Sequence, residues 1–499
     1  MSETARLLIP AVVADPNGRF ESARPAIAEA LALGVGGFAL YGGEQDAVRA
    51  LTRELQQKSR VPLLVGADME RGAGQQFGGA TGLPPLAAIA ALDDMEALRR
   101  AARLTAREAR TMGVNWTFGP VCDLDLEPDN PVLGTRVLGS DPERVGRLAV
   151  AWIEACQAEG VVACAKHFPG HGRTTVDPHR ALPVVSTDRD TLHATDLAPF
   201  RAVIQAGVAS MMAAHVSYPS LDPSGLPATL SRELLTWLLR QQMRYDGLLV
   251  ADGLQMGAVM QVAGSEGDAA VRAISAGCDV LLAPRDLAGT AAALERALAD
   301  RVLDPVRVQQ SVRRRLKWAQ WAAPPNDWRR PIAADAAWGA QLADRVVHVA
   351  RGAEPRIGGA MELVVVDDDA LVATDGVPAS ASRLPSREPL AEALRRAGVE
   401  VRAADADAGA GAGTTARVVA LFGEVRPWKG RAGYAPESLA AVRAACDEAR
   451  AAGRQVIVLQ FDHPRLVGTI PGDAPVVCGW SGDRAMQQAV ARWLLARRG

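Results

Sequence analysis

The sequence predicts a (β/α)8 barrel of the TIM type, followed by a smaller α/β sandwich domain. Through residue 290, short β-branched runs alternate with longer segments rich in Ala, Leu, Arg and Glu that have helical periodicity. The strand runs are almost continuously apolar, as expected for parallel strands buried on both faces. A doubly wound open sheet is the competing arrangement. It predicts a glycine-rich phosphate loop after the first strand, and the sequence has none there.

Eight strands account for the barrel. We expect them at 6–14, 34–42, 61–68, 114–124, 161–168, 209–217, 247–254 and 278–284. Segments long enough for crossover helices lie between them, such as 93–113 and 141–160. A stretch rich in proline and tryptophan, residues 321–339, ends the domain. The expected boundaries are 1–325 for the barrel, 326–345 for a linker and 346–499 for the second domain.

The second domain shows a new alternation of strands and helices. We expect strands at 362–369, 416–424, 454–461 and 474–480, with helices at 436–452 and 482–498. The low-complexity segment 404–416 is expected to be a solvated loop. This pattern predicts a small three-layer α/β domain.

Composition excludes several classes of protein. The chain of 499 residues is too long for one ordinary core, and 55 basic against 57 acidic residues provide no basic stripe for nucleic acid. No run is apolar enough to span a membrane, and the N-terminus does not resemble a signal peptide. The six cysteines lack metal-binding spacings and are expected to be reduced, which favours a cytoplasmic protein. Nothing indicates a cofactor, and the oligomeric state stays open.

Ionisable residues fall near the ends of several predicted strands, where a barrel has its active face. They are Asp68, Lys166, His167, His215 and Asp252. A charge at the end of an apolar strand is costly unless it has a partner or a task. Asp252 has two interpretations: the cap of a following helix, or a nucleophilic carboxylate in the barrel mouth.

The segment KHFPGHGRTTVDPH, residues 166–179, is dense in ionisable groups. Asp177 and His179 lie two positions apart, and a carboxylate beside an imidazole fixes its tautomer for acid/base work. The glycines before them predict a flexible connection. A metal site formed by His167, His171 and His179 is the alternative, but Pro169 and two glycines argue against the helix that HxxxH ligation favours.

Together these motifs resemble glycoside hydrolase family 3, in particular its β-N-acetylglucosaminidases. KHFPGHG followed by Asp-x-His is the first motif, and four other segments match in order: GADMERGAGQQF…TGLPP (66–85), GPVCDL…NPVLGTRVLGSDP (119–142), SMMAAHVSYP (210–219) and VADGLQMGAV (250–259). The resemblance covers the whole barrel. The second domain is only weakly similar to the sandwich domain of two-domain members.

The resemblance implies retaining hydrolysis of a terminal β-linked N-acetylglucosamine, from muropeptides or chitooligosaccharides. Asp252 then corresponds to the nucleophile and His179 to the general acid/base, with Asp177 as its partner. Residues that hold the sugar correspond to Asp68, Arg136, Lys166 and His167, and we expect His215, on the same rim, to contact the substrate with them.

Several alternatives stay open at this stage. A β-glucosidase or β-xylosidase of the same family takes its acid from elsewhere, and Glu424 is the candidate for that role. A phosphorylase can use the same histidine dyad, because a histidine acid does not repel phosphate as a carboxylate does. A degenerate sugar-binding protein is the non-enzymatic alternative.

Overall fold

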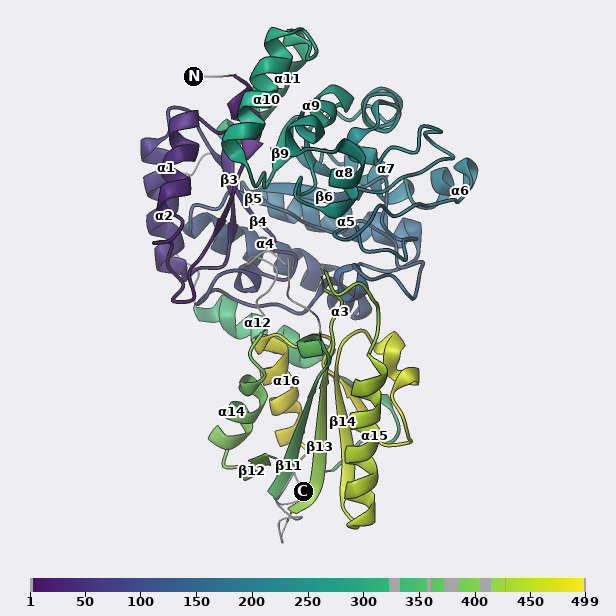
Figure 1. Cartoon of the computed structure of the whole chain (residues 1–499). Coiled ribbons are helices and arrows are strands. Elements are labelled where there is room, and N and C mark those ends of the chain that lie inside the picture. Colours follow the sequence, from purple (N-terminus) through teal and green to yellow (C-terminus); the bar gives the residue numbers. More distant parts are fainter. Residues whose placement is uncertain are drawn as a thin grey trace.

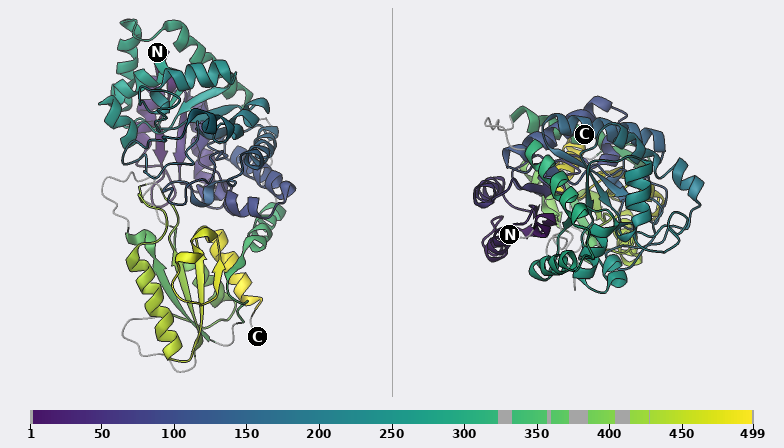
Figure 2. Two further views of the ribbon diagram at one scale, coloured as in Figure 1. Left: turned by 90° about the vertical axis from the view of Figure 1, so that its right-hand side faces the viewer. Right: turned by 90° about the horizontal axis from the view of Figure 1, so that it is seen from above.

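The computed structural model describes residues 3–322, 333–356, 360–371, 385–403, 414–426 and 428–497, which form two domains stacked end to end (Figures 1 and 2). The upper domain in Figure 1 is a parallel barrel surrounded by helices, and the lower one is a sheet with helices on both faces. The predicted barrel and sandwich are therefore confirmed. None of the described helices is long and apolar enough to cross a lipid bilayer.

Each of the eight predicted barrel strands contains an observed strand, and the first contains two. The barrel strands are β1 Leu8–Ile9, β2 Ala11–Val13, β3 Gly37–Tyr41, β4 Leu64–Ala67, β5 Trp116–Thr117, β6 Val162–Phe168, β7 Ser210–Ala213, β8 Leu248–Ala251 and β9 Val280–Leu282. Pro10 lies between β1 and β2 and has no N–H to donate. Because β1 pairs with β9 and β2 with β3, the barrel closes through the backbone at this proline.

Helices cover the outside of the barrel. They are α1 Arg24–Leu33, α2 Gln45–Lys58, α3 Leu86–Ala91, α4 Met95–Thr111, α5 Pro142–Ala158, α6 Arg189–Ala194, α7 Ala198–Gln205, a π-type helix Glu233–Gln242, α8 Gly257–Ala263, α9 Glu266–Ala276, α10 Leu287–Ala299 and α11 Pro305–Trp321. The starts of α4 and α5 are set by Asp94 and Asp141, whose side chains accept backbone N–H groups of the first turn. Side chains such as Trp116, Val162 and Val250 fill the barrel interior, so both faces of each strand are buried.

The second domain has six described strands. They and their helices are α12 Ala333–Val346, β10 His348–Arg351, β11 Ala360–Asp367, α14 Glu388–Arg396, β12 Val401–Ala403, β13 Thr414–Phe422, α15 Pro436–Ala451, β14 Gln455–Phe461, β15 Val476–Cys478 and α16 Arg484–Leu495. The sheet order is β10-β15-β14-β13-β11-β12, with only β10 antiparallel. Helices α12, α14 and α16 pack on one face and α15 on the other, which forms the three layers. Most of the predicted loop 404–416 lies outside the described residues.

The two domains meet through side chains from both. Helix α12 overlaps most of the stretch predicted as a linker, and Arg345 near its end pairs with Asp94 at 2.7 Å. The guanidinium of Arg100 lies 4.5 Å from the ring of Trp338.

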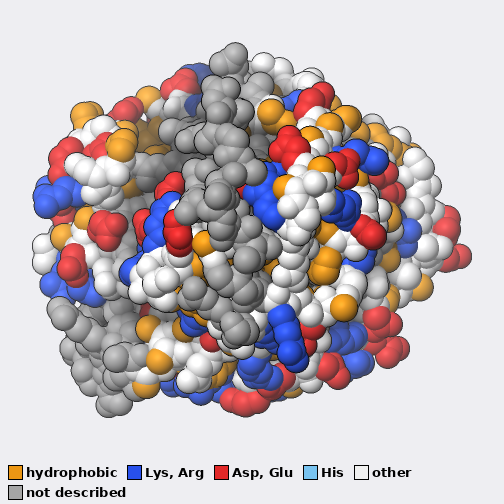
Figure 3. Space-filling model, turned by 90° about the horizontal axis from the view of Figure 1, so that it is seen from below, with side chains coloured by type: hydrophobic (Ala, Val, Ile, Leu, Met, Phe, Trp, Pro, Cys, Tyr) orange, Lys and Arg blue, Asp and Glu red, His pale blue; other side chains and the backbone are white. Residues whose placement is uncertain are grey.

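The face of the second domain that points away from the barrel is shown in Figure 3. On it, the described acidic and basic side chains are interspersed without a large patch of one sign.

The carboxyl ends of both sheets point toward the domain boundary. In the second sheet, strand order reverses between β11 and β13, which is the switch point where open α/β sheets place their crevice. Residues that follow β13 enter the mouth of the barrel and line its pocket. The active face of the barrel therefore has a floor from one domain and a roof from the other.

Candidate active site

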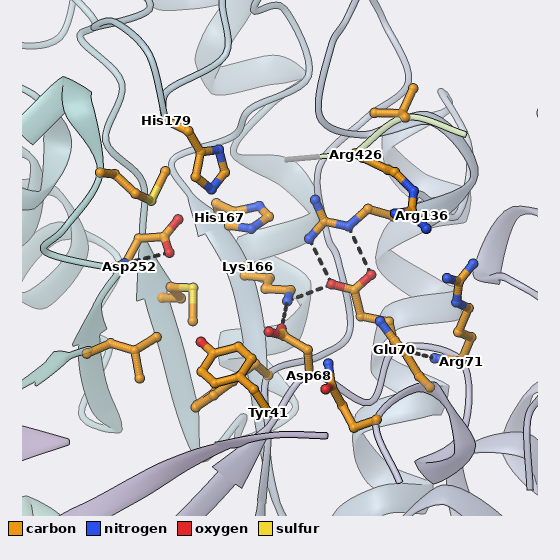
Figure 4. A pocket seen from close by; sticks show the side chains of 18 of the residues that line it. Tyr41, Asp68, Glu70, Arg71, Arg136, Lys166, His167, His179, Asp252 and Arg426 are labelled. Atoms are coloured by element: carbon orange, nitrogen blue, oxygen red, sulfur yellow. Dashed lines mark hydrogen bonds and ion pairs between the residues drawn. The ribbon is translucent and has the colours of Figure 1, made fainter. Parts of the chain in front are cut away.

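A pocket of about 310 Å³ lies at the carboxyl end of the barrel strands (Figure 4). Its floor includes residues that directly follow β4 and β8, namely Asp68 and Asp252. Lys166 and His167 are among the last three residues of β6. The alternation of apolar strand and polar strand end thus places these side chains on one rim, as the sequence predicts for a barrel.

Four side chains on one side of the pocket form a connected charged group. Lys166 Nζ lies 2.7 Å from Asp68 Oδ1 and 2.6 Å from Glu70 Oε1. Arg136 donates to both oxygens of Glu70, from Nε at 3.0 Å and from Nη2 at 2.8 Å. Figure 4 shows that Lys166 and Arg136 converge on Glu70. This arrangement presents both donors and acceptors in fixed positions, as recognition of sugar hydroxyls requires.

The charges of this group support one another. Burial raises the pKa of Glu70, but the charges of Arg136 and Lys166 lower it by more, so it lies well below its ordinary value. Burial lowers the pKa of Lys166, while Asp68 and Glu70 raise it above its ordinary value. Glu70 is therefore an anion and Lys166 a cation at neutral pH.

His167 is held by a carboxylate beneath it. Its Nδ1 lies 2.7 Å from Asp123 Oδ2, and its backbone N–H donates to the same side chain. Asp123 is buried, and although burial raises its pKa, the neighbouring His167 lowers it below the ordinary value. An ionised carboxylate only accepts hydrogen bonds, so Nδ1 carries the proton and Nε2 is left for the pocket.

Asp252 stands on the opposite side of the pocket from Glu70 (Figure 4). Its Oδ1 accepts the N–H of Gly253 at 2.7 Å. Burial raises the pKa of Asp252, but the imidazoles of His167 and His215 and the Gly253 N–H lower it below its ordinary value. Asp252 is thus an ionised carboxylate facing a cavity, and its side chain caps no helix; α8 begins at Gly257 and has no side-chain cap.

His215 does not line the pocket, which differs from the substrate contact predicted for it. It is buried, with Nδ1 2.7 Å from Thr229 Oγ1 and Nε2 3.1 Å from the carbonyl of Gly253. Both ring nitrogens are thereby occupied. His215 supports the backbone beside Asp252 and does not reach the pocket.

Asp177 and His179 form the pair that their spacing predicts. His179 Nδ1 lies 2.7 Å from Asp177 Oδ1, and the His179 N–H donates to the same oxygen at 2.9 Å. Burial raises the pKa of Asp177, but the hydrogen bond and charge of His179 lower it below the ordinary value. Asp177 is not part of the pocket lining, whereas His179 lines the pocket on the same side as Asp252 (Figure 4).

The three histidines of the 166–179 segment have three separate partners. His167 contacts Asp123, His179 contacts Asp177, and His171 Nδ1 lies 2.5 Å from Thr174 Oγ1. Burial lowers the pKa of His171 to about 4, so this imidazole is neutral. Among the described residues, no group of three or more His, Cys, Asp or Glu side chains is placed to hold a metal ion.

The roof of the pocket comes from the second domain. Glu424, Arg426 and Trp428 line the cavity, and Arg71 from the barrel joins them. Arg71 Nη1 lies 3.6 Å from Glu424 and donates to Ser481 Oγ at 2.8 Å. Burial raises the pKa of Glu424, but the charge of Arg71 lowers it below its ordinary value. Glu424 is therefore held as an anion, which is the wrong state for a proton donor.

Sequence reasoning missed two carboxylates and the aromatic side chain of the roof. Glu70 lies in a loop two residues beyond Asp68, so it does not stand at a strand end. Asp123 is the penultimate residue of the predicted strand 114–124, but no sequence pattern connects it to His167; in the structure it lies six residues beyond the end of β5. Both residues lie inside the motif segments 66–85 and 119–142. Trp428 follows a strand of the other domain, and no local pattern connects it to the barrel.

Comparison with known proteins places the chain in a family. The family model described as "Glycosyl hydrolase family 3 N terminal domain" matches residues 24–317, more than half of the chain. A "Beta-N-acetylglucosaminidase/beta-glucosidase" of Cellulomonas fimi is 35% identical over 291 residues, which cover 56% of this chain and 51% of that protein. A "Beta-hexosaminidase" of Thiobacillus denitrificans is 38% identical over 258 residues, covering 50% of this chain and 71% of that protein.

The chain thus spans about half the length of the Cellulomonas protein. Among solved structures, a glycoside hydrolase family 3 β-N-acetylglucosaminidase from a Paenibacillus species superposes with a TM-score of 0.83 at 27% identity. That superposition covers 100% of this chain and 96% of the other, so it includes both domains. The protein belongs to glycosyl hydrolase family 3.

Proposed function

We propose that the protein is a retaining glycoside hydrolase that releases terminal β-linked N-acetylglucosamine from the non-reducing end. The observation that carries this proposal is the pairing of an ionised Asp252 with a carboxylate-held His179 around one cavity. The charged group of Asp68, Glu70, Arg136 and Lys166 lines the same cavity and supports a sugar ligand. The names of the relatives support the acetamido sugar.

In the first step, an oxygen of Asp252 attacks the anomeric carbon and forms an ester with it. The bond to the leaving oxygen breaks as His179 transfers its Nε2 proton to that oxygen. In this step the imidazolium of His179 becomes a neutral imidazole, while Asp177 stays ionised. Two carboxylates are the usual retaining pair, and here a histidine and its carboxylate replace one of them.

In the second step, water attacks the same carbon. His179, now neutral, accepts a proton from that water at Nε2, and the ester bond to Asp252 breaks with return of its electron pair. The sugar leaves with its original configuration, and both residues regain their starting protonation states. Asp177 acts on the reaction through His179, because its hydrogen bond fixes which ring nitrogen faces the cavity.

A panel of 4-nitrophenyl β-glycosides that differ only at C2 tests this function. We expect turnover of the N-acetylglucosaminide and at least a tenfold lower kcat/KM for the glucoside and xyloside. Asp252→Ala should lower kcat by on the order of 10³-fold or more, as removal of a nucleophile does. Unchanged turnover in that variant contradicts the assignment of Asp252, and a wild type without turnover favours a sugar-binding protein.

Phosphorolysis is a second candidate, and the histidine acid favours it. An imidazole is neutral or cationic, so an incoming phosphate anion meets less repulsion than it does from a carboxylate. Turnover in phosphate buffer separates the two reactions: a hydrolase yields N-acetylglucosamine, whereas a phosphorylase yields its 1-phosphate.

A β-glucosidase or β-xylosidase in which Glu424 is the general acid is less well supported. Glu424 is held as an anion, and an anion has no proton to donate.

We also propose that the protein acts in the cytoplasm on fragments of the cell wall. The six cysteines support this location, because all six are buried thiols without disulfide bonds. Fractionation of the source cells tests the location. Release of N-acetylglucosamine from purified muropeptides, compared with release from chitooligosaccharides, tests the substrate.

A further inference from the structure

The segment that follows β13 crosses from the second domain to the barrel. It begins at the switch point of the second sheet and places Glu424, Arg426 and Trp428 in the lining of the barrel pocket. The mechanism above uses none of these three residues. Trp428 is of interest because it also contacts the loop that carries the acid/base pair.

The position of Trp428 is fixed by the residue after it. Lys429 is fully buried, and its Nζ donates to the carbonyls of Gly423 at 2.8 Å and Glu424 at 3.1 Å. The same nitrogen lies 2.9 Å from Asp368. A buried ammonium with these partners holds the turn firmly to its own domain, because any displacement leaves buried charges unpaired.

The backbone of Trp428 has a conformation that side chains rarely adopt. Its φ is +70°, in the left-handed region that favours glycine. Such a conformation persists only where its surroundings enforce it, and residues of this kind cluster at functional sites. Here the conformation directs the indole toward the barrel and the carbonyl toward Arg180.

Trp428 contacts the acid/base loop through both its ring and its backbone. Its ring centroid lies 5.0 Å from that of His179. Its carbonyl accepts hydrogen bonds from Nε of Arg180 at 3.0 Å and from Nη2. A Cβ atom at Gly430 would lie 3.0 Å from the Arg180 guanidinium carbon, so the turn and the loop are closely packed.

The opposite side of the loop is fixed by the barrel. The N–H of Gly257 donates to the carbonyl of His179 at 3.1 Å, and the N–H of Ala258 donates to that of Pro178 at 3.0 Å. Both donors lie at the start of α8, which follows Asp252 in the chain. The loop is thus held between the barrel on one side and Trp428 on the other.

We propose that Trp428 is a positioning residue for the general acid/base. The indole of the second domain packs against the His179 ring and keeps its Nε2 at the leaving-group side of the pocket. This role rests on the proposed function. It makes protonation of the leaving group dependent on the second domain, whereas attack by Asp252 depends on the barrel alone.

Kinetics with two aryl glycosides of similar shape test this division. The dinitrophenolate group of the 2,4-dinitrophenyl N-acetylglucosaminide leaves without receiving a proton. The phenolate group of the phenyl glycoside needs a proton to leave. We expect Trp428→Ala to lower kcat/KM for the phenyl glycoside by on the order of tenfold, a part of what a positioned acid contributes. The dinitrophenyl glycoside should change by no more than about twofold, and Trp428→Phe should retain most of the activity. Trp237→Ala, on the exposed surface of the barrel, is the matched control.

A double-mutant cycle with His179→Ala separates positioning from binding. If Trp428 acts through His179, then Trp428→Ala has no further effect on the phenyl glycoside once His179 is removed. A further loss in that background, or an equal loss for both glycosides in the single variant, overturns the proposal and assigns Trp428 to leaving-group binding or to folding.

Hydrogen exchange tests the contact without any turnover. We expect the amides of Asp177 and of residues 179–181 to exchange faster in Trp428→Ala than in the wild type, and Trp428→Phe and Trp237→Ala to match the wild type. Unchanged exchange in Trp428→Ala overturns the positioning role. If the wild type turns over neither glycoside, the proposed function fails, while the exchange experiment still decides whether Trp428 orders the loop.

Discussion

Nδ1 of His179 lies 2.7 Å from Oδ1 of Asp177, and that carboxylate is not part of the pocket lining. The pair leaves a single ring nitrogen of His179 for the ligand. The geometry fits a group that gives and takes one proton at one place.

Removal of His179 should affect poor leaving groups selectively. We expect His179→Ala to lower kcat/KM for phenyl N-acetylglucosaminide by about 10²- to 10⁴-fold, the usual contribution of a positioned acid. The rate of the glycosylation step should fall far less for the dinitrophenyl glycoside. The burst of dinitrophenolate measures that rate. The control is His348→Gln, because His348 is an exposed residue of β10. An equal loss for both substrates contradicts the acid role.

Glu424 should not serve as the proton donor. In Glu424→Gln we expect the ratio of kcat/KM between the phenyl and dinitrophenyl glycosides to stay within about threefold of the wild type, while an essential acid would change it by 10²-fold or more. The physical reason is the pairing with Arg71, which keeps Glu424 ionised. A selective loss of the phenyl substrate would revive the glucosidase-type alternative.

Glu70 should make stability depend on pH in acid. Its pKa in the folded state lies below the ordinary 4.5, so protons bind the unfolded state more readily and stability falls as the pH drops below 4.5. In urea unfolding, the wild-type midpoint should fall between pH 6 and pH 3.5, and Glu70→Gln should reduce that fall. At pH 6 the variant should be less stable by about 1.5–3 kcal/mol, the usual value for hydrogen bonds to charged groups.

Asp462 should have the opposite pH dependence. Burial raises its pKa from 3.8 to about 8, and its Oδ2 has no hydrogen-bond partner among the described residues. Between these values the unfolded state loses the proton while the folded state keeps it, so stability falls as the pH rises. Asp462→Asn removes this titration. We expect a gain in the urea midpoint at pH 7.5 that is larger than the gain at pH 5, and an equal gain at both would contradict the shift.

The fold was largely predictable because barrel strands are buried on both faces and therefore form almost continuous apolar runs in the sequence. Each of the eight apolar runs contains a barrel strand, even where the strand is as short as Trp116–Thr117. Strands β10 and β12 were missed, since both are short edge strands that need little apolar sequence. The bounds 326–345 for a linker stay a prediction, although α12 occupies most of them.

The candidate site was predictable where its residues end a strand. Asp68, Lys166, His167 and Asp252 were found in this way, and all four line the pocket. Glu70 and Asp123 were not, because each is held in place by contacts distant in sequence: Glu70 with Arg136 and Lys166, and Asp123 with His167. Periodicity reports which face a residue occupies, and it carries no information on such pairings.

The division of the pocket between two domains has a consequence for engineering. The charged side chains Asp68, Glu70, Arg136 and Lys166 of the pocket belong to the barrel, and Glu70 and Lys166 are buried there, where changes disturb a closely packed interior. Glu424, Arg426 and Trp428 follow the end of a single strand, β13, of the other domain. If Trp428 positions His179 as proposed, exchange of that short segment between related enzymes offers a way to tune protonation of the leaving group while Asp252 and the other barrel residues of the pocket stay unchanged.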